Sequence, residues 1–304
     1  MPRLKTKAAK KGLLHHVKRE RLKYITILPS LITILNGVCG FAAIVFAGKG
    51  PDGGIGGLSY LAIAGYLVVL AMIADMLDGR VARMSQSTSS FGGQLDSLCD
   101  IVSFGVAPAF LVVKLLEARV LGLSGANPVL ATFLKRFVWL SAAVYVSCAA
   151  IRLARFNVEN EEDESAHMSF MGLPTPAAAG VVVSLVIFHQ ETLRGFGQQR
   201  SPVYLFFESA ILYALPLVAL AVALLMISRL RYPHIINQYI EGKKPFAYLT
   251  RILLVLAFAI WNLPAALVLV FGLFAASSVV KRFYYRVIKR SSLVGALAKF
   301  QVEE

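Results

Sequence analysis

Long apolar runs recur along this 304-residue chain, and they constrain its fold more than any other feature. Each run can cross the hydrocarbon core of a bilayer, which is about 30 Å thick and needs about 20 helical residues. Only helices and closed barrels satisfy their backbone hydrogen bonds in lipid, and runs of this length are typical of helices. Charged residues make up 16% of the chain, against about 25% in an average soluble protein. The sequence therefore predicts an all-α integral membrane protein.

We expect a polytopic bundle of about eight transmembrane helices. The predicted spans are 26–47, 57–77, 94–113, 137–155, 173–189, 204–227, 246–261 and 264–281. The last two come from one apolar run that "WNLP" (Trp261–Pro264) interrupts. The proline there favours a tight hairpin over one kinked helix.

Lys and Arg residues are distributed unevenly between the expected loops. If the N-terminus is cytoplasmic, 24 of the 31 Lys and Arg residues lie on the cytoplasmic side. This is the asymmetry that the positive-inside rule describes. Both termini are then cytoplasmic, and so is the loop between the second and third spans. Because topology accounts for the net charge of +14, we expect no nucleic-acid partner.

The spans divide the chain into four regions. Residues 1–23 carry nine Lys and Arg residues and form a basic cytoplasmic segment, either a helix on the membrane surface or a disordered tail. Residues 24–190 hold the first five spans, 191–283 hold additional transmembrane helices, and 284–304 form a cytoplasmic tail.

Four aspartates lie between the second and third spans. Asp75 and Asp78 are three residues apart at the end of one span, and Asp96 and Asp100 are four apart at the start of the next. Each spacing puts a pair on one helix face. Four carboxylates this close repel one another unless some are protonated or divalent cations lie among them. Oxygen ligands suit Mg²⁺, Mn²⁺ or Ca²⁺, and carboxylates that share two ions suit two-metal phosphoryl chemistry.

The residues between the two pairs suit a phosphate ester. Gly79, Gly92 and Gly93 allow a ligand to approach the backbone closely, and Arg83 offers a bidentate donor. A solvated acidic loop and a divalent-cation transport site are the alternatives. A transporter needs a polar path across the membrane, and the spans hold few ionisable residues away from the cytoplasmic end.

The stretch reads D-x-x-D-G-x-x-A-R, then eight residues, then G-x-x-x-D-x-x-x-D. This order resembles the signature of the CDP-alcohol phosphotransferases, integral-membrane enzymes that move a phosphate-bearing group from a CDP-linked donor to an alcohol and release CMP. The fixed positions of the signature are Asp75, Asp78, Gly79, Ala82, Arg83, Gly92, Asp96 and Asp100.

The resemblance implies a role for each of these positions. Asp75, Asp78 and Asp96 would hold one divalent cation (Mg²⁺ or Mn²⁺, with Ca²⁺ as a further candidate). Asp75, Asp96 and Asp100 would hold a second, and Asp100 would also be the general base of catalysis. The nucleotide would lie against Gly79, Ala82, Arg83, Gly92 and, in the first span, Asn36. Residues 24–190 would then be the catalytic core.

Three further segments, Ile101–Phe110, Ile151–Asn157 and Phe170–Gly180, resemble the phosphatidylserine synthase branch of this family, as does Leu28–Ile44 in the first span. That branch transfers the phosphatidyl group from CDP-diacylglycerol to the hydroxyl of L-serine, giving phosphatidylserine and CMP. The resemblance covers roughly residues 24–180. The alternatives are another acceptor alcohol, such as glycerol 3-phosphate, inositol phosphate or choline, or the cation transporter.

Candidate residues for binding serine follow from its carboxylate, which favours an arginine partner. Arg152 and Arg155 end the fourth span on one helix face, Asn157 lies beside them, and Ser103 lies one turn beyond Asp100. Their structural alternatives are ordinary membrane anchoring and a hydrogen bond of the serine to its own helix.

The resemblance also implies a setting for the protein. We expect a bacterial cytoplasmic (inner) membrane, an active site that faces the cytoplasm, and a homodimer. Membrane lipids are further partners, because the basic N-terminal segment favours an anionic lipid surface.

Overall fold

The computed structural model describes residues 29–50, 53–85, 90–123, 127–162, 170–193, 202–232 and 245–300. The predicted basic segment 1–23 lies outside these residues. The described chain is almost wholly helical, with two small antiparallel sheets. One pairs β1 (Gly54–Ile55) with β2 (Leu58–Ser59), and the other pairs β3 (Phe170–Met171) with β4 (Arg231–Tyr232).

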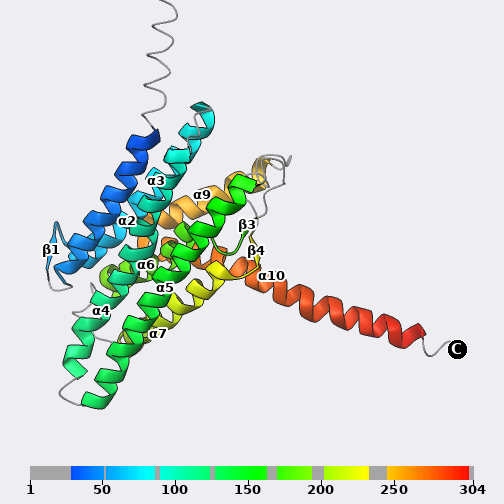
Figure 1. Ribbon diagram of the computed structural model, residues 1–304. Coiled ribbons are helices and arrows are strands. Elements are labelled where there is room, and N and C mark those ends of the chain that lie inside the picture. The colour runs from blue at the N-terminus through cyan, green and yellow to red at the C-terminus, as the bar shows by residue number, and fades with distance from the viewer. Residues whose placement is uncertain are drawn as a thin grey trace, which may run out of the picture.

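The helices follow one another through the bundle shown in Figure 1. They are the first helix (Pro29–Gly48), α2 (Tyr60–Ser85), α3 (Ser90–Asp100), the π-helix η1 (Ile101–Val106), α4 (Ala107–Leu123), α5 (Pro128–Glu162), α6 (Thr175–Phe188), the π-helix η2 (His189–Leu193), α7 (Pro202–Ile227), α9 (Pro245–Trp261) and α10 (Leu263–Phe300).

The described residues contain seven helices that are long and apolar enough to cross a membrane. They correspond to the first six predicted spans and to the last. The remaining prediction, 246–261, falls on α9, whose 17 residues measure about 26 Å, slightly less than the thickness of a typical hydrocarbon core. The prediction of an all-α polytopic membrane protein is confirmed.

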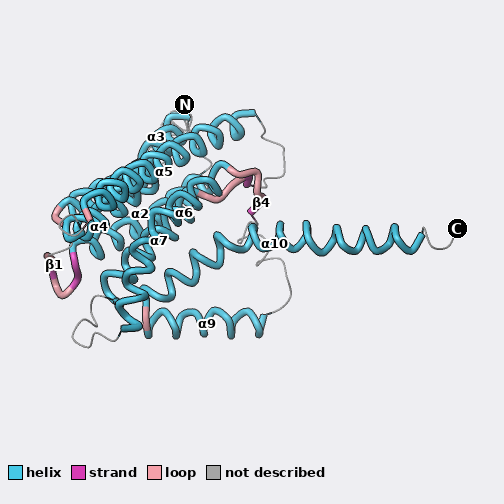
Figure 2. The backbone as a smooth tube through the Cα atoms, turned by 90° about the horizontal axis from the view of Figure 1, so that it is seen from below, coloured by secondary structure: helices cyan, strands magenta, loops and turns pink. Residues whose placement is uncertain are grey.

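The interruption between the last two helices is the tight hairpin that the sequence predicts. α9 ends at Trp261 and α10 begins at Leu263, and Figure 2 shows the two helices diverging from this turn. Asn262 caps α10, because its side-chain oxygen accepts a hydrogen bond from the backbone N–H of Ala265 at 3.0 Å. Pro264 lies in the first turn, where an N–H has no helical partner.

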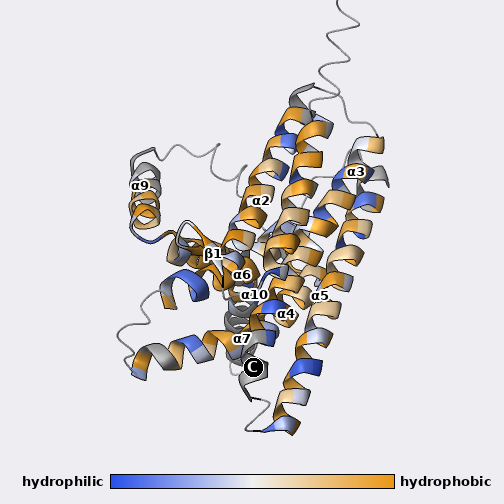
Figure 3. Cartoon of the chain, turned by 90° about the vertical axis from the view of Figure 1, so that its left-hand side faces the viewer, coloured by the Kyte–Doolittle hydropathy of each residue, from blue (hydrophilic) through white to orange (hydrophobic). Residues whose placement is uncertain are grey.

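Small residues line the contacts between helices. α6 is buried over most of its length and packs against α2, α7 and α10. A Cβ atom at Gly180 would overlap Phe271 of α10, and one at Gly65 of α2 would lie 2.5 Å from Ile187 of α6. Close backbone approach of this kind stabilises helix pairs in lipid, where burial of apolar surface gives no net gain. Apolar residues predominate along the helices in Figure 3.

Several helices continue beyond the predicted spans. α2 extends to Ser85 and α3 begins at Ser90, so Gly79 and Gly92 lie in helices rather than in a linker. α10 passes the predicted boundary at residue 283 without a break. The aspartates are therefore held on regular helices, which places them more rigidly than a loop would.

Candidate active site

Three of the four aspartates form a compact cluster between α2 and α3. One carboxylate oxygen from each of Asp75, Asp78 and Asp96 lies within 4.8 Å of the other two. Asp78 Oδ2 and Asp96 Oδ1 are buried and have no hydrogen-bond partner among the described residues. A buried carboxylate oxygen is unfavourable unless a donor or a cation compensates it. The donor set, oxygen atoms only, fits a hard divalent cation.

The fourth aspartate, Asp100, is 7% exposed and lies close enough to the other three to interact with them electrostatically. The amide Nδ2 of Asn36, a fully buried residue of the first helix, donates a hydrogen bond to Asp100 Oδ1 at 2.9 Å. One turn earlier on that helix, Thr33 lies beside Asp78, which is 5% exposed. The first helix thus supplies polar partners to the two most buried aspartates.

Two glycines bring the first helix this close to the aspartates. A Cβ atom at Gly37 would lie 2.9 Å from Cys99 Sγ, and one at Gly40 would overlap Ser103. The hydroxyl of Ser103 donates to the backbone oxygen of Asn36 at 2.9 Å. Since both glycines face the segment around Asp100, the close crossing holds Asn36 against that carboxylate.

A π-helical turn follows Asp100 directly. In η1 the N–H of Ala107 donates to the carbonyl oxygen of Val102, five residues back. The carbonyl oxygen of Phe104 accepts a hydrogen bond from the hydroxyl of Tyr145 in α5 at 3.1 Å, and both residues are buried. π-helical turns inside helices occur often at functional sites. Here the turn is anchored to α5 immediately after the aspartates.

Arg152 of α5 lies beside the aspartates. Arg152 Nη1 donates to Thr175 Oγ1 at 2.7 Å, and the guanidinium carbon lies 5.9 Å from the centre of the Phe156 ring. The positive charge of Arg152 also acts on Asp75. Arg155, three residues further along α5, is partly exposed.

Asn157 connects α5 to α3 next to the cluster. Its Nδ2 lies 2.9 Å from Ser97 Oγ, and its Oδ1 lies 3.1 Å from the same hydroxyl. Ser97 follows Asp96 directly in α3. The contact between Asn157 and Ser97 therefore fixes the separation of α3 and α5 next to Asp96.

Open space adjoins the cluster where the sequence predicts a nucleotide. A Cβ atom at Gly79, the residue after Asp78, would meet no described atom within 4 Å, and the same holds for Gly93. A ligand can therefore approach the backbone at these positions. The backbones of Ala82 and Arg83 lie in α2, while their side chains are outside the described part of the chain.

Two predicted residues have partners within the protein. The amide of Asn36, expected near the nucleotide, donates to Asp100. The hydroxyl of Ser103, expected beside the acceptor, joins the first helix to η1, and both predicted ligand contacts stay predictions. Both remain within the same cluster of polar groups.

Sequence reasoning missed Thr33, Ser97 and Thr175. Thr33 carries a readable signal, because it precedes Asn36 by three residues and so shares its helix face. Ser97 and Thr175 act through residues that are 60 and 23 positions away in the chain. No local pattern indicates such contacts.

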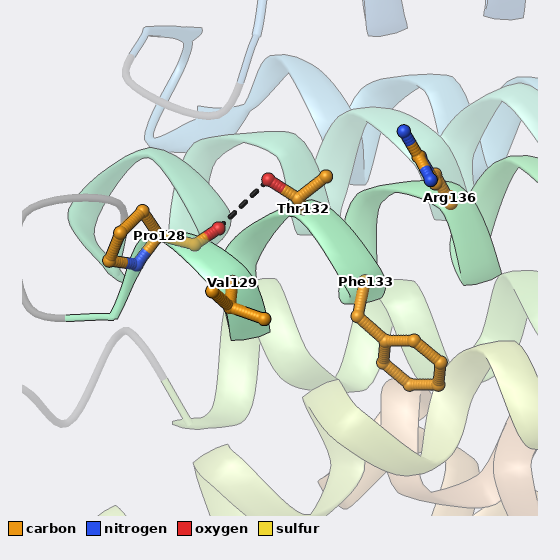
Figure 4. A pocket seen from close by; sticks show the side chains of 5 residues that line it. All are labelled: Pro128, Val129, Thr132, Phe133 and Arg136. Atoms are coloured by element: carbon orange, nitrogen blue, oxygen red, sulfur yellow. Dashed lines mark hydrogen bonds between the residues drawn. The ribbon is translucent and has the colours of Figure 1, made fainter.

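A hollow of about 440 Å³ lies on the first two turns of α5. Figure 4 shows its lining residues, Pro128, Val129, Thr132, Phe133 and Arg136. Thr132 is directed back to its own helix, where its hydroxyl donates to the carbonyl oxygen of Pro128 at 2.8 Å. Arg136 precedes Arg152 by 16 residues, about 24 Å along one helix, so this hollow is separate from the aspartates.

Several relatives of this chain carry the name CDP-diacylglycerol–serine O-phosphatidyltransferase, among them proteins from three distant organisms. The protein of Helicobacter pylori is 32% identical over 209 residues, which cover 68% of this chain and 72% of the relative. The protein of Methanocaldococcus jannaschii is 30% identical over 236 residues, covering 78% of this chain and 85% of the relative. The Saccharomyces cerevisiae protein is 36% identical over 163 residues, about half of each chain. The sequence profile of the CDP-alcohol phosphatidyltransferases matches residues 26–227, and the chain belongs to that family.

Proposed function

We propose that this protein transfers the phosphatidyl group of CDP-diacylglycerol to the hydroxyl of L-serine, giving phosphatidylserine and CMP. The observation that carries the proposal is the cluster of Asp75, Asp78 and Asp96, with Asp100 beside it, at one end of an apolar helix bundle. The names and coverage of the relatives support serine as the acceptor. The acyl chains of the donor remain in lipid while its head group reaches the aspartates.

Two divalent cations suit this carboxylate set, either Mg²⁺ or Mn²⁺, with Ca²⁺ as a further candidate. In our proposal Asp75, Asp78 and Asp96 hold one, and Asp75, Asp96 and Asp100 hold the other. The buried, unpartnered oxygens of Asp78 and Asp96 support this assignment. When bound, such cations offset the negative charge of the pyrophosphate and of the departing CMP.

Asp100 is the proposed general base. A serine hydroxyl is a weak nucleophile at neutral pH, so a positioned carboxylate that takes its proton accelerates attack. The serine oxygen forms a bond to the phosphorus that carries diacylglycerol, and the bond from that phosphorus to the CMP oxygen breaks. Asn36 fixes Asp100 through Oδ1, which leaves Oδ2 to receive the proton.

The nucleotide is proposed to lie along the end of α2 and the start of α3. Gly79 and Gly92 allow the cytidine diphosphate to approach the helices, and the open space beside Gly79 supports this. Ala82 and Arg83 continue the same surface of α2 in our proposal. A planar guanidinium at position 83 suits bidentate binding of a phosphate.

The acceptor is proposed to lie on the α5 side of the cluster. Arg152 and Arg155 would bind the carboxylate of serine. The electrostatic interaction of Arg152 with Asp75 supports a position of Arg152 next to the cation site. Asn157 and Ser103 would line the proposed serine-binding site. Asn157 is hydrogen-bonded to Ser97 and Ser103 to the first helix, and these bonds hold both side chains close to Asp100.

The arrangement in the membrane forms part of the proposal. In a bacterial inner membrane we propose a cytoplasmic aspartate end and two cytoplasmic termini, with α9 crossing as the eighth span, and the distribution of Lys and Arg supports this orientation. Residues 24–190 would be the catalytic core, 191–283 additional helices, and 1–23 and 284–304 cytoplasmic segments. The family resemblance suggests a homodimer.

A comparison of acceptors tests the proposal. Purified protein is mixed with CDP-diacylglycerol and Mn²⁺, and CMP release is measured with serine, glycerol 3-phosphate, inositol phosphate or choline. We expect release with serine, and its loss when a chelator removes the cation. Release with a different alcohol alone would keep the chemistry and reject serine. No release with any of the four would reject the transferase.

A further inference from the structure

Thr175 has an unusual position for a hydroxyl-bearing residue at a helix start. It is the first residue of α6 and is fully buried. A threonine there often bonds the backbone of its own helix. Instead its Oγ1 accepts a hydrogen bond of 2.7 Å from Arg152 of α5, which lies 23 positions earlier in the chain. Bonds of this length between a charged donor and a hydroxyl are strong and directional.

Arg152 needs an uncharged partner such as Thr175 because its other neighbour, Asp75, is a proposed cation ligand. Its guanidinium is attracted to Asp75, which the proposed function makes a ligand of both cations. Cation binding would neutralise that carboxylate and repel the guanidinium at the same time. The hydroxyl of Thr175 and the ring of Phe156 carry no net charge, so their contacts with Arg152 persist when the cations are bound.

Backbone hydrogen bonds fix the position of the segment before Thr175, and therefore the position of its hydroxyl. The N–H of Gly172 donates to the carbonyl oxygen of Leu230 at 2.8 Å, and the N–H of Leu173 donates to that of Leu225 at 3.0 Å. Gly172 has a φ of 86°, and a Cβ atom there would overlap the carbonyl group of Met226. Position 172 therefore requires glycine. The backbone conformation that leads into α6 is fixed by these contacts.

The additional helices support the same segment. β3 pairs with β4, and the hydroxyl of Tyr232 in β4 donates to the carbonyl oxygen of Ala275 in α10 at 3.2 Å. Both residues are buried. A chain of contacts thus runs from α10 and the end of α7 to Thr175 and on to Arg152.

We propose that Thr175 is a positioning residue, which keeps the guanidinium of Arg152 directed at the carboxylate of the incoming serine once divalent cations occupy the aspartates. The inference rests on the proposed function and adds to it the device that holds the acceptor side. It also gives the additional helices a role, because α7 and α10 support the strand that places Thr175.

The first test compares Thr175→Val, which keeps the shape and removes the oxygen, with Thr175→Ser, which keeps the oxygen. We expect Thr175→Val to raise the KM for serine about tenfold, the size typical of a lost hydrogen bond to a charged group, with a much smaller change in kcat. Thr175→Ser should restore the KM. An unchanged KM in a folded, active Thr175→Val protein would overturn the inference.

A double-mutant cycle shows whether Thr175 acts through Arg152. In an Arg152→Ala background, Thr175→Val should cause no further rise in the KM for serine, because the partner is already absent. An equal rise in both backgrounds would place the effect elsewhere. The affinity for Mn²⁺, measured by calorimetry without substrate, should stay within about twofold of wild type, since no hydrogen bond joins Thr175 to a described aspartate.

A chemical probe tests the inference independently of any acceptor. Phenylglyoxal modifies accessible guanidinium groups, and mass spectrometry follows its attachment to Arg152 in Mn²⁺-loaded protein. Modification should be faster in Thr175→Val than in wild type and Thr175→Ser. Equal modification rates in wild type and Thr175→Val would overturn the inference, whatever the acceptor. Absence of CMP release with serine in wild-type protein would instead reject the proposed function.

Discussion

Asp96 and Asp100 lie one turn apart on α3, yet their surroundings differ. Asp96 has a buried oxygen, Oδ1, with no hydrogen-bond partner among the described residues, which suits a cation ligand. Asp100 is the more buried of the two, and its Oδ1 is already held by Asn36. The two carboxylates therefore suit different tasks in our proposal: Asp96 binds cations only, whereas Asp100 also takes a proton in addition to its share of the second cation.

Removing each charge should separate these tasks. Asp100→Asn should lower turnover by about 10²- to 10⁴-fold, the usual contribution of a general base, and weaken Mn²⁺ binding less than Asp96→Asn does. CMP release gives the turnover, and calorimetric titration gives the Mn²⁺ affinity. Thermal unfolding of both variants controls for folding. Turnover of Asp100→Asn equal to wild type would remove the base assignment.

At the scale of single residues, the sequence predicts neighbours on one helix and misses partners on another. The spacing of Asp75 and Asp78, and of Asp96 and Asp100, predicts paired carboxylates, because helical geometry is local. The contact of Asn36 with Asp100 spans 64 positions. It depends on how two helices cross, and no periodicity in the chain encodes that.

The crossing of the first helix with the α3–η1 segment brings Asn36 to Asp100. Gly37 and Gly40 face α3 and η1, where an added Cβ atom would meet Cys99 and Ser103. The glycines are three positions apart, so they share one face of the first helix. That face also carries Asn36.

Gly40→Ala should therefore damage the site without touching an aspartate. The new methyl group must push η1 away from the first helix, and we expect destabilisation of about 1–3 kcal/mol, as for other overpacked contacts. Turnover should fall because Asn36 moves with the helix. Thermal unfolding and CMP release measure the two effects.

Gly48→Ala is the matched control, since it lies on the same helix and a Cβ atom there would meet no described atom within 4 Å. It should leave turnover unchanged and stability equal or slightly higher. Equal effects of the two substitutions would show that the close crossing does not hold the site.

At the scale of elements, the apolar runs predict where helices cross the membrane but not where they end. α2 and α3 continue beyond their apolar segments into polar sequence. The start of α3 contains Gly92 and Gly93, which disfavour a helix, so packing against α5 rather than propensity accounts for it. The π-helix η1 is equally invisible in the sequence. Its register depends on contacts such as that of Tyr145 with Phe104, which form only when α5 packs against it.

The molecule as a whole places its chemistry at one end. Asp75 lies 15 residues after the start of α2, about 22 Å along the helix, and the β1–β2 hairpin precedes that start. The hairpin and the aspartates therefore lie toward opposite ends of the second span. In our proposal the aspartate end faces the cytoplasm, as the distribution of Lys and Arg suggests.

Cysteine labelling in intact cells tests this orientation. Cys39, Cys99 and Cys148 are replaced first, and the resulting protein must remain active. Ile55→Cys, at an exposed hairpin position, should react with a membrane-impermeant maleimide, whereas Arg282→Cys on α10 should react only after permeabilisation. The opposite pattern would place the aspartates on the outer side.

The stoichiometry of one turnover tests the central claim most directly. Purified protein receives CDP-diacylglycerol, Mn²⁺ and ¹³C-labelled serine, and both CMP and labelled phosphatidylserine are quantified by mass spectrometry. We predict one phosphatidylserine for each CMP, because the serine oxygen replaces CMP at the same phosphorus and the buried Asp100 limits competition from water. Release of CMP without incorporation of labelled serine into lipid would contradict the account.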